Sequence, residues 1–381
     1  MKLEIKELKE IMSKISLAVE KSKINPKSSW IEIETVDGKL NFRVANFDYY
    51  LETSVNIPQE QTNETLHVTI SADTFIPLIS KLDCDVVYVS EKFNALYLES
   101  ENGEYNFPVI KELGKTKSVD KIDFKATSQA ITLNGEDLSS VALTNTNGLL
   151  NAIISKDIQQ YIYIDELGAI TFTENIYVNT FNHNCDGHFK ALLTVTQAKL
   201  LEIFEGIEKV NLEVENEDTF SDVPTKTNKL HFYTDNIDLI LVTQNIDKVE
   251  KFPCIKLRVL SDNPEQTHVV IDKKQLDKAL ARLMIFDKKF DITVMDYSKL
   301  IFKEDGLELV SVKNKNSEKL KYISSQNVVE HESMIRFADL VKQLKAITSK
   351  EVDISYGSRP AIVLNGNVKQ LIPEIRVVSK V

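Results

Sequence analysis

The sequence predicts an α+β fold of three tandem domains, each a doubled unit of a helix followed by antiparallel strands. Three observations support this prediction. The chain has 381 residues, more than a single hydrophobic core usually holds. A pattern of strand, amphipathic helix and strand recurs along the chain. Its short strands are bounded by turn residues, including Asp-Gly pairs that are typical of hairpins.

The recurring pattern occupies residues 67–89, 191–214 and 333–355, so its copies start about 120 to 140 residues apart. In each predicted helix the apolar residues are spaced three or four positions apart, which is typical of a helix that packs one face on a sheet. Charge-, Gly- or Pro-bearing connections at 111–120 and 249–264 separate the copies. The expected domains are therefore residues 1–118, 119–252 and 253–381.

Each third also has an earlier helix. The spacing predicts helices over 5–19 and 272–286, whereas 136–147 is polar and poor in strong helix formers. Antiparallel sheets with helices on one face follow from this order of elements. The predicted strands span 30–35, 39–45, 95–99, 161–165, 169–173, 230–234, 238–243, 290–295 and 307–312.

Composition indicates a globular, cytoplasmic protein. The chain is 43% hydrophobic and 27% charged, has a formal net charge of −11, and contains no apolar stretch long enough to span a membrane. Its beginning alternates charged and apolar residues, unlike a signal peptide. Cys84, Cys185 and Cys254 are few and scattered, which argues against a disulfide framework.

Four short strings resemble the bacterial sliding-clamp family, the β subunits of DNA polymerase III. They are 105–108 (YNFP), 251–258 (KFPCIKLR), 281–286 (ARLMIF) and 371–376 (LIPEIR). The layout of three doubled domains matches that family along almost the whole chain. The chain departs from the family pattern at 173–178 (TENIYV), which lacks Gly-His-Arg, and by one additional residue between Pro373 and Arg376.

The resemblance implies a DNA-clamp fold whose six domains, three from each of two subunits, close into a ring. Such a protein is not an enzyme and needs no cofactor. It encircles double-stranded DNA without reading its sequence, and tethers a DNA polymerase after a separate clamp loader has opened the ring. Its subunits form a head-to-tail homodimer. In this chain the implied contact joins Tyr105 and Phe107 to Ile285 and Phe286, although Ile285 and Phe286 could also simply end a core stripe.

The distribution of basic residues agrees with a positive inner wall. The predicted helices at the N-terminus, at 272–289 and at 336–350 carry an excess of lysine and arginine in an acidic protein. Ordinary solvated surface is the alternative for any single helix. The residues predicted to face DNA are Lys9, Lys14, Lys273, Lys274, Lys278, Arg282, Arg336, Lys342 and Lys345.

The resemblance also implies an apolar cleft between the second and third domains that binds short partner peptides. Core packing is the alternative for each of its residues taken singly. The matching positions are Thr173, Ile176, Val178, Pro253, Leu257, Ile372, Pro373 and Ile375.

Other chemistry has weak support. The string 114–116 (GKT) lacks the first glycine of a phosphate-binding loop, so a basic loop between domains is the better interpretation. His183, Cys185 and His188 offer three metal ligands, but a structural zinc site usually needs four, and a polar hairpin at Asp186-Gly187 is favoured; no metal is predicted. The main rival function is a β-rich structural or interaction protein of a virus or mobile element that does not encircle DNA, and a hydrolase that uses the histidine–cysteine loop comes third.

Overall fold

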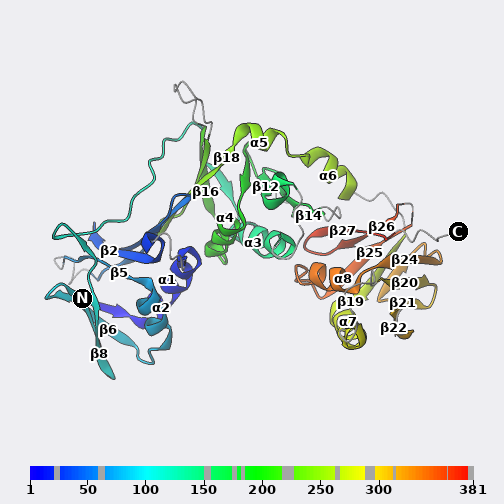
Figure 1. Ribbon diagram of the computed structural model, residues 1–381, viewed down its shortest axis with the longest axis horizontal. Helices are drawn as coiled ribbons and strands as arrows, with labels where there is room; N and C mark the ends of the chain where they lie inside the picture. The colour runs from blue at the N-terminus through cyan, green and yellow to red at the C-terminus, as the bar shows by residue number, and fades with distance from the viewer. Residues whose placement is uncertain are drawn as a thin grey trace. The chain divides into compact units, whose positions relative to one another are not determined.

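The computed structural model describes residues 1–20, 26–58, 65–149, 156–173, 178–181, 185–216, 227–261, 267–287, 297–311, 315–357 and 359–375 (Figure 1). These residues form two compact units. Unit 1 contains residues 1–138 and 200–246, and unit 2 contains residues 139–199 and 247–381. Both units combine helices with antiparallel sheets, which confirms the predicted α+β fold.

Unit 1 is built on an eight-stranded antiparallel sheet in the order β11-β16-β17-β18-β4-β3-β2-β5. The central pairing joins β4 to β18, with Thr53 opposite Ile237, so strands from distant parts of the chain share one sheet. A four-stranded sheet has the order β1-β6-β7-β8, and β9 and β10 form a small hairpin. The strands are β1 (Lys2–Glu4), β2 (Trp30–Val36), β3 (Lys39–Ala45), β4 (Tyr49–Asn56), β5 (His67–Ser71), β6 (Val86–Lys92), β7 (Ala95–Ser100), β8 (Gly103–Pro108), β9 (Lys111–Glu112), β10 (Lys115–Thr116), β11 (Ile131–Leu133), β16 (Val210–Asn216), β17 (Thr227–Tyr233) and β18 (Ile237–Asn245).

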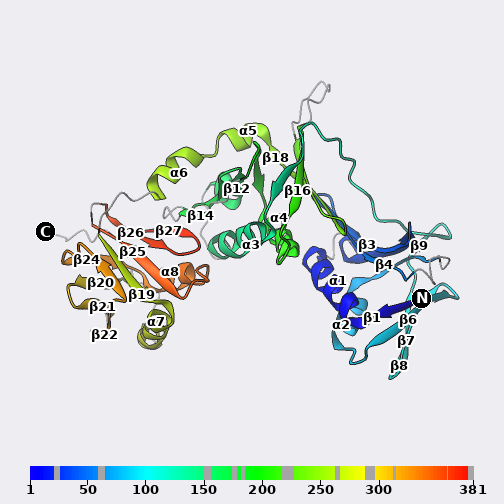
Figure 2. The same cartoon turned by 180° about the vertical axis from the view of Figure 1, so that it is seen from behind.

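Helices α1 (Ile5–Ala18) and α2 (Ala72–Lys81) pack side by side in unit 1 (Figure 2). The apolar stripe of α1, which includes Leu8, Ile11 and Ile15, is buried as its spacing predicts. The short 3-10 helices η1 (Pro26–Ser29) and η4 (Leu201–Phe204) complete this unit.

Unit 2 contains a nine-stranded antiparallel sheet in the order β15-β12-β13-β14-β27-β26-β25-β19-β23 and a four-stranded sheet in the order β22-β21-β20-β24. The pairing of β14 with β27 joins strands that are almost two hundred residues apart, about half the chain. The strands are β12 (Ile162–Asp165), β13 (Gly168–Thr171), β14 (Val178–Phe181), β15 (Lys190–Leu193), β19 (His268–Asp272), β20 (Ser298–Lys303), β21 (Gly306–Ser311), β22 (Asn316–Leu320), β23 (Ser324–Gln326), β24 (His331–Ile335), β25 (Glu351–Ser355), β26 (Ala361–Asn365) and β27 (Lys369–Pro373).

Helices α7 (Lys273–Asp287) and α8 (Phe337–Leu344) pack together in unit 2 (Figure 1). Their residues Leu276, Leu280 and Leu340 are buried. The other elements are α4 (Val195–Leu200), α5 (Ile246–Glu250), α6 (Cys254–Ser261) and the 3-10 helix η3 (Asp157–Gln160).

All three predicted strand–helix–strand segments form, as β5-α2-β6, β15-α4-β16 and β24-α8-β25. The weakly predicted helix at 136–147 is α3 (Gly135–Leu149). Its start is fixed because the Asn134 side chain accepts a hydrogen bond from the Glu136 amide at 2.8 Å and because Leu138 and Val141 are buried. A Cβ on Gly135 would lie 2.2 Å from the Phe204 carbonyl oxygen, so only glycine fits there.

Two expectations differ from the structure or fall outside it. The expected connection at 249–264 contains a helix, α6, that buries Leu257 and that was not predicted from the sequence. The expected strand at 290–295 lies outside the described residues. The three domain boundaries remain predictions.

Candidate functional site

The exposed side of α7 carries a basic stripe. Lys274, Lys278 and Arg282 follow one another at intervals of four residues and therefore share one face of the helix, opposite the buried leucines. Lys274 and Lys278 make no ion pair with any described residue. Arg282 donates two hydrogen bonds to Glu318 of β22, at 2.6 and 2.9 Å. Lys273, also predicted to face DNA, pairs with Asp277 at 2.7 Å.

The Arg282–Glu318 pair affects both ionisable groups. Its hydrogen bond raises the pKa of Arg282 and lowers the pKa of Glu318. Glu318 therefore keeps its negative charge beside Arg282, one of the residues predicted to face DNA.

Helix α8 adds basic residues beside this stripe. Arg336, at the N-cap of α8, and Lys345, at its C-cap, are exposed, and Lys342 is half-buried in its last turn. Together with α7, the helix forms what we call the α7–α8 surface, defined by Lys274, Lys278, Arg282, Arg336, Lys342 and Lys345.

The basic residues predicted on α1 are held differently. The Lys9 ammonium donates a 2.7 Å hydrogen bond to the Leu82 carbonyl at the C-terminal end of α2. The Lys14 ammonium lies 3.1 Å from the Glu10 carboxylate, one turn earlier. Both lysines are partly buried, and each charge already has a partner within unit 1.

Strand register decides which predicted cleft residues share a face. Val178 on β14 lies directly opposite Leu371 on β27, and Pro373 follows two residues later on the same face. Ile372 points to the opposite face, where it is buried. Leu371 was not among the predicted cleft residues. The sequence does not reveal the register, and Leu371 is buried together with Val178.

Helix α6 packs against β14 and β27. Leu257 is buried, whereas Pro253, just before the helix, is only half-buried. Arg258 donates hydrogen bonds of 2.8 and 2.5 Å to the buried Asp165 carboxylate. Burial opposes the charge of Arg258, but the bonds to Asp165 outweigh it and raise the pKa of the guanidinium. This pair fixes α6 on the sheet.

The remaining predicted cleft residues, Thr173, Ile375 and Ile176, differ in their surroundings. Thr173 is buried, and its hydroxyl has no hydrogen-bond partner in the described part of the chain. The Ile375 amide donates a 2.7 Å hydrogen bond to the Met334 carbonyl of β24, which ties the end of the described chain to the neighbouring sheet. Ile176 lies outside the described residues.

The residues predicted to join two subunits lie at sheet edges and helix ends. Tyr105 is half-exposed on β8, the edge strand of its sheet, whereas Phe107 is buried against Phe75 with ring centroids 5.1 Å apart. Ile285 and Phe286, in the last turn of α7, are 61% and 50% exposed. These exposures leave Tyr105, Ile285 and Phe286 accessible to a partner, and Phe107 much less so.

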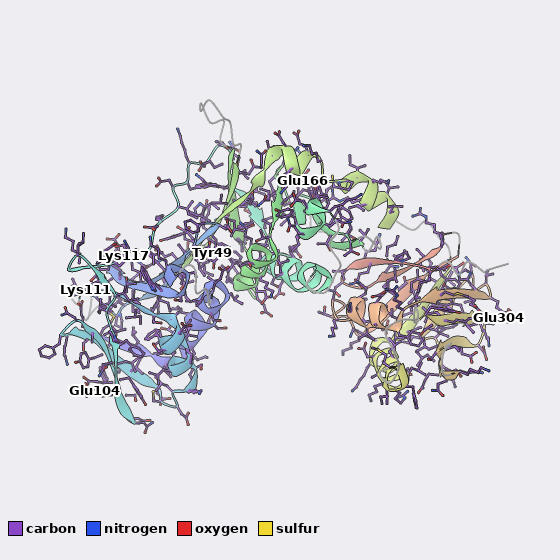
Figure 3. The ribbon with its side chains drawn as sticks, in the orientation of Figure 1. Tyr49, Glu104, Lys111, Lys117, Glu166 and Glu304 are labelled. Carbon is purple, nitrogen blue, oxygen red and sulfur yellow. The ribbon has the colours of Figure 1, made fainter. Side chains whose placement is uncertain are left out.

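The described residues of the histidine–cysteine loop make local contacts. His188 Nδ1 lies 3.2 Å from the carboxylate of Glu166, and burial raises the pKa of the Cys185 thiol. Figure 3 labels Glu166. His183 lies outside the described part of the chain, and within that part no group of three or more histidine, cysteine or acidic side chains is arranged to hold a metal ion. No helix among the described residues is long and apolar enough to cross a membrane.

Comparison with solved structures identifies the fold. The β subunit of DNA polymerase from Streptococcus pyogenes superposes with a TM-score of 0.74 at 17% identity, over 99% of both chains. The fold is that of a DNA sliding clamp. The sliding clamp of Bacillus subtilis gives a TM-score of 0.71 at 14% identity, and the clamp of Pseudomonas aeruginosa bound to griselimycin gives 0.73 at 12% identity, each over 99% of both chains. No family model and no curated protein sequence matches the chain.

This likeness covers the clamp fold from end to end, and it confirms the fold that the resemblance implied. The low identities mean that few side chains are shared, so the clamp fold does not by itself carry over the properties of particular residues.

Proposed function

We propose that the protein is a sliding clamp, a processivity factor without catalytic activity that encircles double-stranded DNA and tethers a DNA polymerase. The observation that carries this proposal is the combination of a clamp fold along 99% of the chain with a basic α7–α8 surface in a protein of net charge −11. A basic surface in an acidic protein favours loose contact with phosphates, which permits sliding because no base is read.

Ring closure would join two copies head to tail. The exposed Ile285 and Phe286 of one copy and the β8 edge with Tyr105 of the other supply the apolar contact and an unpaired strand edge. A separate clamp loader would open the ring.

Partner binding would use the outer face of the sheet beside α6. Val178 and Leu371 are buried where α6 packs on the sheet, so an extended peptide would contact the half-buried Pro253 and Pro373 instead. A polymerase held there gains a high effective concentration at its template.

The decisive experiment compares closed circular with linearised plasmid after loading, in a gel-filtration column at moderate salt. A topological ring stays with the closed circle and runs off the linear molecule, whereas the rival non-encircling protein shows no difference. Phe286→Asp should abolish both the dimer mass and the retention, because it places a charge in the apolar contact. Phe47→Asp is the matched control, since Phe47 is 85% exposed elsewhere.

Griselimycin provides a probe of the peptide face, because a clamp with this fold has been solved with it bound. We expect calorimetry to detect binding of griselimycin to the protein. Pro373→Asp should remove this binding. Pro108→Asp, which changes an exposed proline on β8, should leave it unchanged. Equal binding by both variants would exclude this face as the site.

A further inference from the structure

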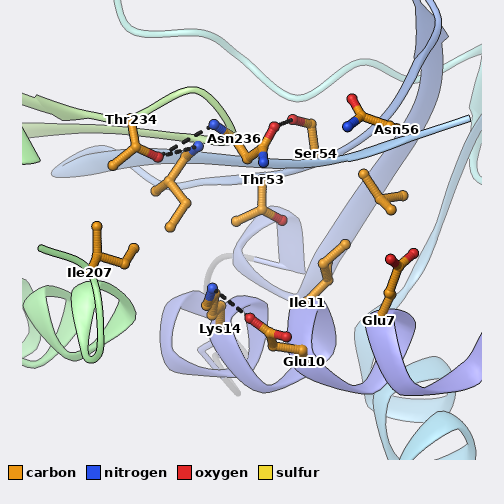
Figure 4. Close-up of a pocket in the computed structure, with 12 residues that line it drawn as sticks. Glu7, Glu10, Ile11, Lys14, Thr53, Ser54, Asn56, Ile207, Thr234 and Asn236 are labelled. Carbon is orange, nitrogen blue, oxygen red and sulfur yellow. Dashed lines mark hydrogen bonds and ion pairs between the residues drawn. The ribbon is translucent and has the colours of Figure 1, made fainter. Parts of the chain in front are cut away.

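A cavity of about 300 Å³ lies in unit 1 between α1, the end of β4 and the β17–β18 turn (Figure 4). It is as large as the smaller ligand-binding pockets of proteins. The cavity is separate from the α6 face and from the α7–α8 surface, both of which belong to unit 2.

The apolar part of the cavity is formed by Ile11 of α1, Val55 of β4, Ile207 and Ile237. Ile11 and Ile237 are buried, and Val55 and Ile207 are half-buried. These side chains come from four separate segments, so an apolar ligand body would contact every wall of the cavity.

The charged groups at the cavity are not balanced. Glu7 and Glu10 project from successive turns of α1, and Lys14 follows Glu10 one turn later. Lys14 pairs with Glu10 at 3.1 Å, whereas Glu7 has no ion-pair partner among the described residues. One carboxylate at the cavity is therefore uncompensated, and it attracts a cation.

Thr53 supplies an independent indication. Its side chain lines the cavity and is 2% exposed, yet its hydroxyl has no hydrogen-bond partner among the described residues. Burial of an unpaired hydroxyl is unfavourable, and a ligand that hydrogen-bonds to it would remove that penalty. Figure 4 shows Thr53 between the strand above and the α1 residues Ile11 and Lys14 below.

We propose that this cavity binds a small primary amine that has a compact apolar body and a hydroxyl group. The ammonium pairs with Glu7, the apolar body contacts the isoleucines, and the hydroxyl reaches Thr53. The ligand would connect α1 and β4 to the β17–β18 turn and so stiffen unit 1. The proposal does not depend on whether the protein encircles DNA.

Three probes that share a 4-hydroxyphenyl-ethyl body test the proposal: tyramine, its neutral analogue tyrosol, and the slightly larger anion 3-(4-hydroxyphenyl)propanoate. Titrations followed by saturation-transfer NMR should show tyramine bound about tenfold more tightly than tyrosol, and the anion weakest of all. Equal affinities, tightest binding of the anion, or no binding of tyramine at low-millimolar concentration would overturn the proposal.

Variants locate the site. Glu7→Gln should abolish the preference for tyramine over tyrosol, whereas Glu4→Gln, the same change outside the cavity, should preserve it. Thr53→Val keeps the shape of the side chain and should weaken tyramine about threefold or more. Asn56→Trp, at the exposed end of β4, should block all probes, and thermal unfolding verifies that each variant is folded. Unchanged tyramine binding in Glu7→Gln and Asn56→Trp would exclude this cavity.

Discussion

Helices α1 and α7 occupy comparable positions in their units, each following a short strand and each packed against a second helix, but they hold their lysines differently. On α1, Lys9 is bound to a carbonyl of α2 and Lys14 to a carboxylate. On α7, Lys274 and Lys278 are exposed and make no ion pair with described residues. Both α1 residues predicted to face DNA therefore have a partner, whereas only two of the four on α7, Lys273 and Arg282, are paired.

The difference shows that the number of lysines on a helix is a poor measure of its attraction for phosphate. A cation that already has a partner in the folded chain must lose that partner, or share it, before it gains a phosphate. We therefore expect the α7–α8 surface to contribute more to DNA binding than α1 does.

The largest effect is expected for Lys274→Glu combined with Lys278→Glu. Both residues are exposed, so the fold should tolerate the change, while two attractive charges become repulsive. Affinity for duplex DNA should fall at least ~10-fold at ~0.1 M salt, and the slope of log K against log salt should decrease by about 2. Fluorescence anisotropy with a labelled duplex measures both quantities.

Lys92→Glu combined with Lys115→Glu is the matched control, because it makes the same charge change on exposed hairpins of unit 1. If both double variants weaken DNA binding equally, the attraction reflects net charge alone and the α7–α8 surface has no special role.

The α1 lysines should affect stability more than DNA binding. Lys9→Met removes the ammonium that bridges α1 to the Leu82 carbonyl of α2, and should cost about 1.5 kcal/mol of unfolding free energy. Lys14→Met removes only a pair with Glu10 within one helix, worth about 0.3 to 0.5 kcal/mol. Urea unfolding measures both values, and neither variant should change DNA affinity more than about twofold. A tenfold loss of DNA affinity in either variant would contradict the contrast between the helices.

The same contrast explains what the sequence could and could not predict. Periodicity located α1, α7 and the basic stripe, because the spacing of Lys274, Lys278 and Arg282 is visible along the chain. It could not show that Lys9 binds Leu82, 73 residues away, or that Arg282 binds Glu318, 36 residues away. Whether a charged side chain is free to contact DNA depends on tertiary contacts, and the neighbouring sequence does not reveal them.

Strand register limited the prediction of the peptide face in a similar way. The residue types around Pro373 suggested an apolar face, but a shift of one residue exchanges Leu371 for Ile372. Pairing of Leu371 with Val178 sets the register, and it depends on a strand almost two hundred residues earlier, about half the chain. Leu371 and Ile372 are both buried, and the peptide cleft stays a prediction. Helix α3 illustrates the converse, because buried contacts and the Asn134 cap stabilise a segment of low helix propensity.

Glu318→Gln should have a smaller and opposite effect on DNA binding. The change removes the negative charge that neutralises Arg282 and leaves a neutral side chain of the same shape. We expect DNA affinity to rise about two- to threefold and the salt slope to increase by about 1, because one more cation is available for phosphate. Glu308→Gln is the control, since Glu308 pairs with Lys303 on the neighbouring hairpin, away from α7. A gain of the same size in Glu308→Gln would indicate a general effect of net charge.

The smallest effect concerns the protonation of Glu318 itself. The hydrogen bond from Arg282 lowers the pKa of this carboxyl in the folded protein, so the pair stabilises the fold above the ordinary glutamate pKa of about 4.3. That contribution is lost as the pH falls through the lowered pKa, because the protonated carboxyl no longer attracts the guanidinium. NMR titration of the Glu318 carboxyl carbon should give a midpoint below the ordinary value, and Arg282→Gln should return the midpoint towards it. If the Glu318 midpoint is the same in Arg282→Gln as in the unsubstituted protein, the two side chains do not pair in solution. Arg282 would then be as available to DNA as Lys274 and Lys278 are.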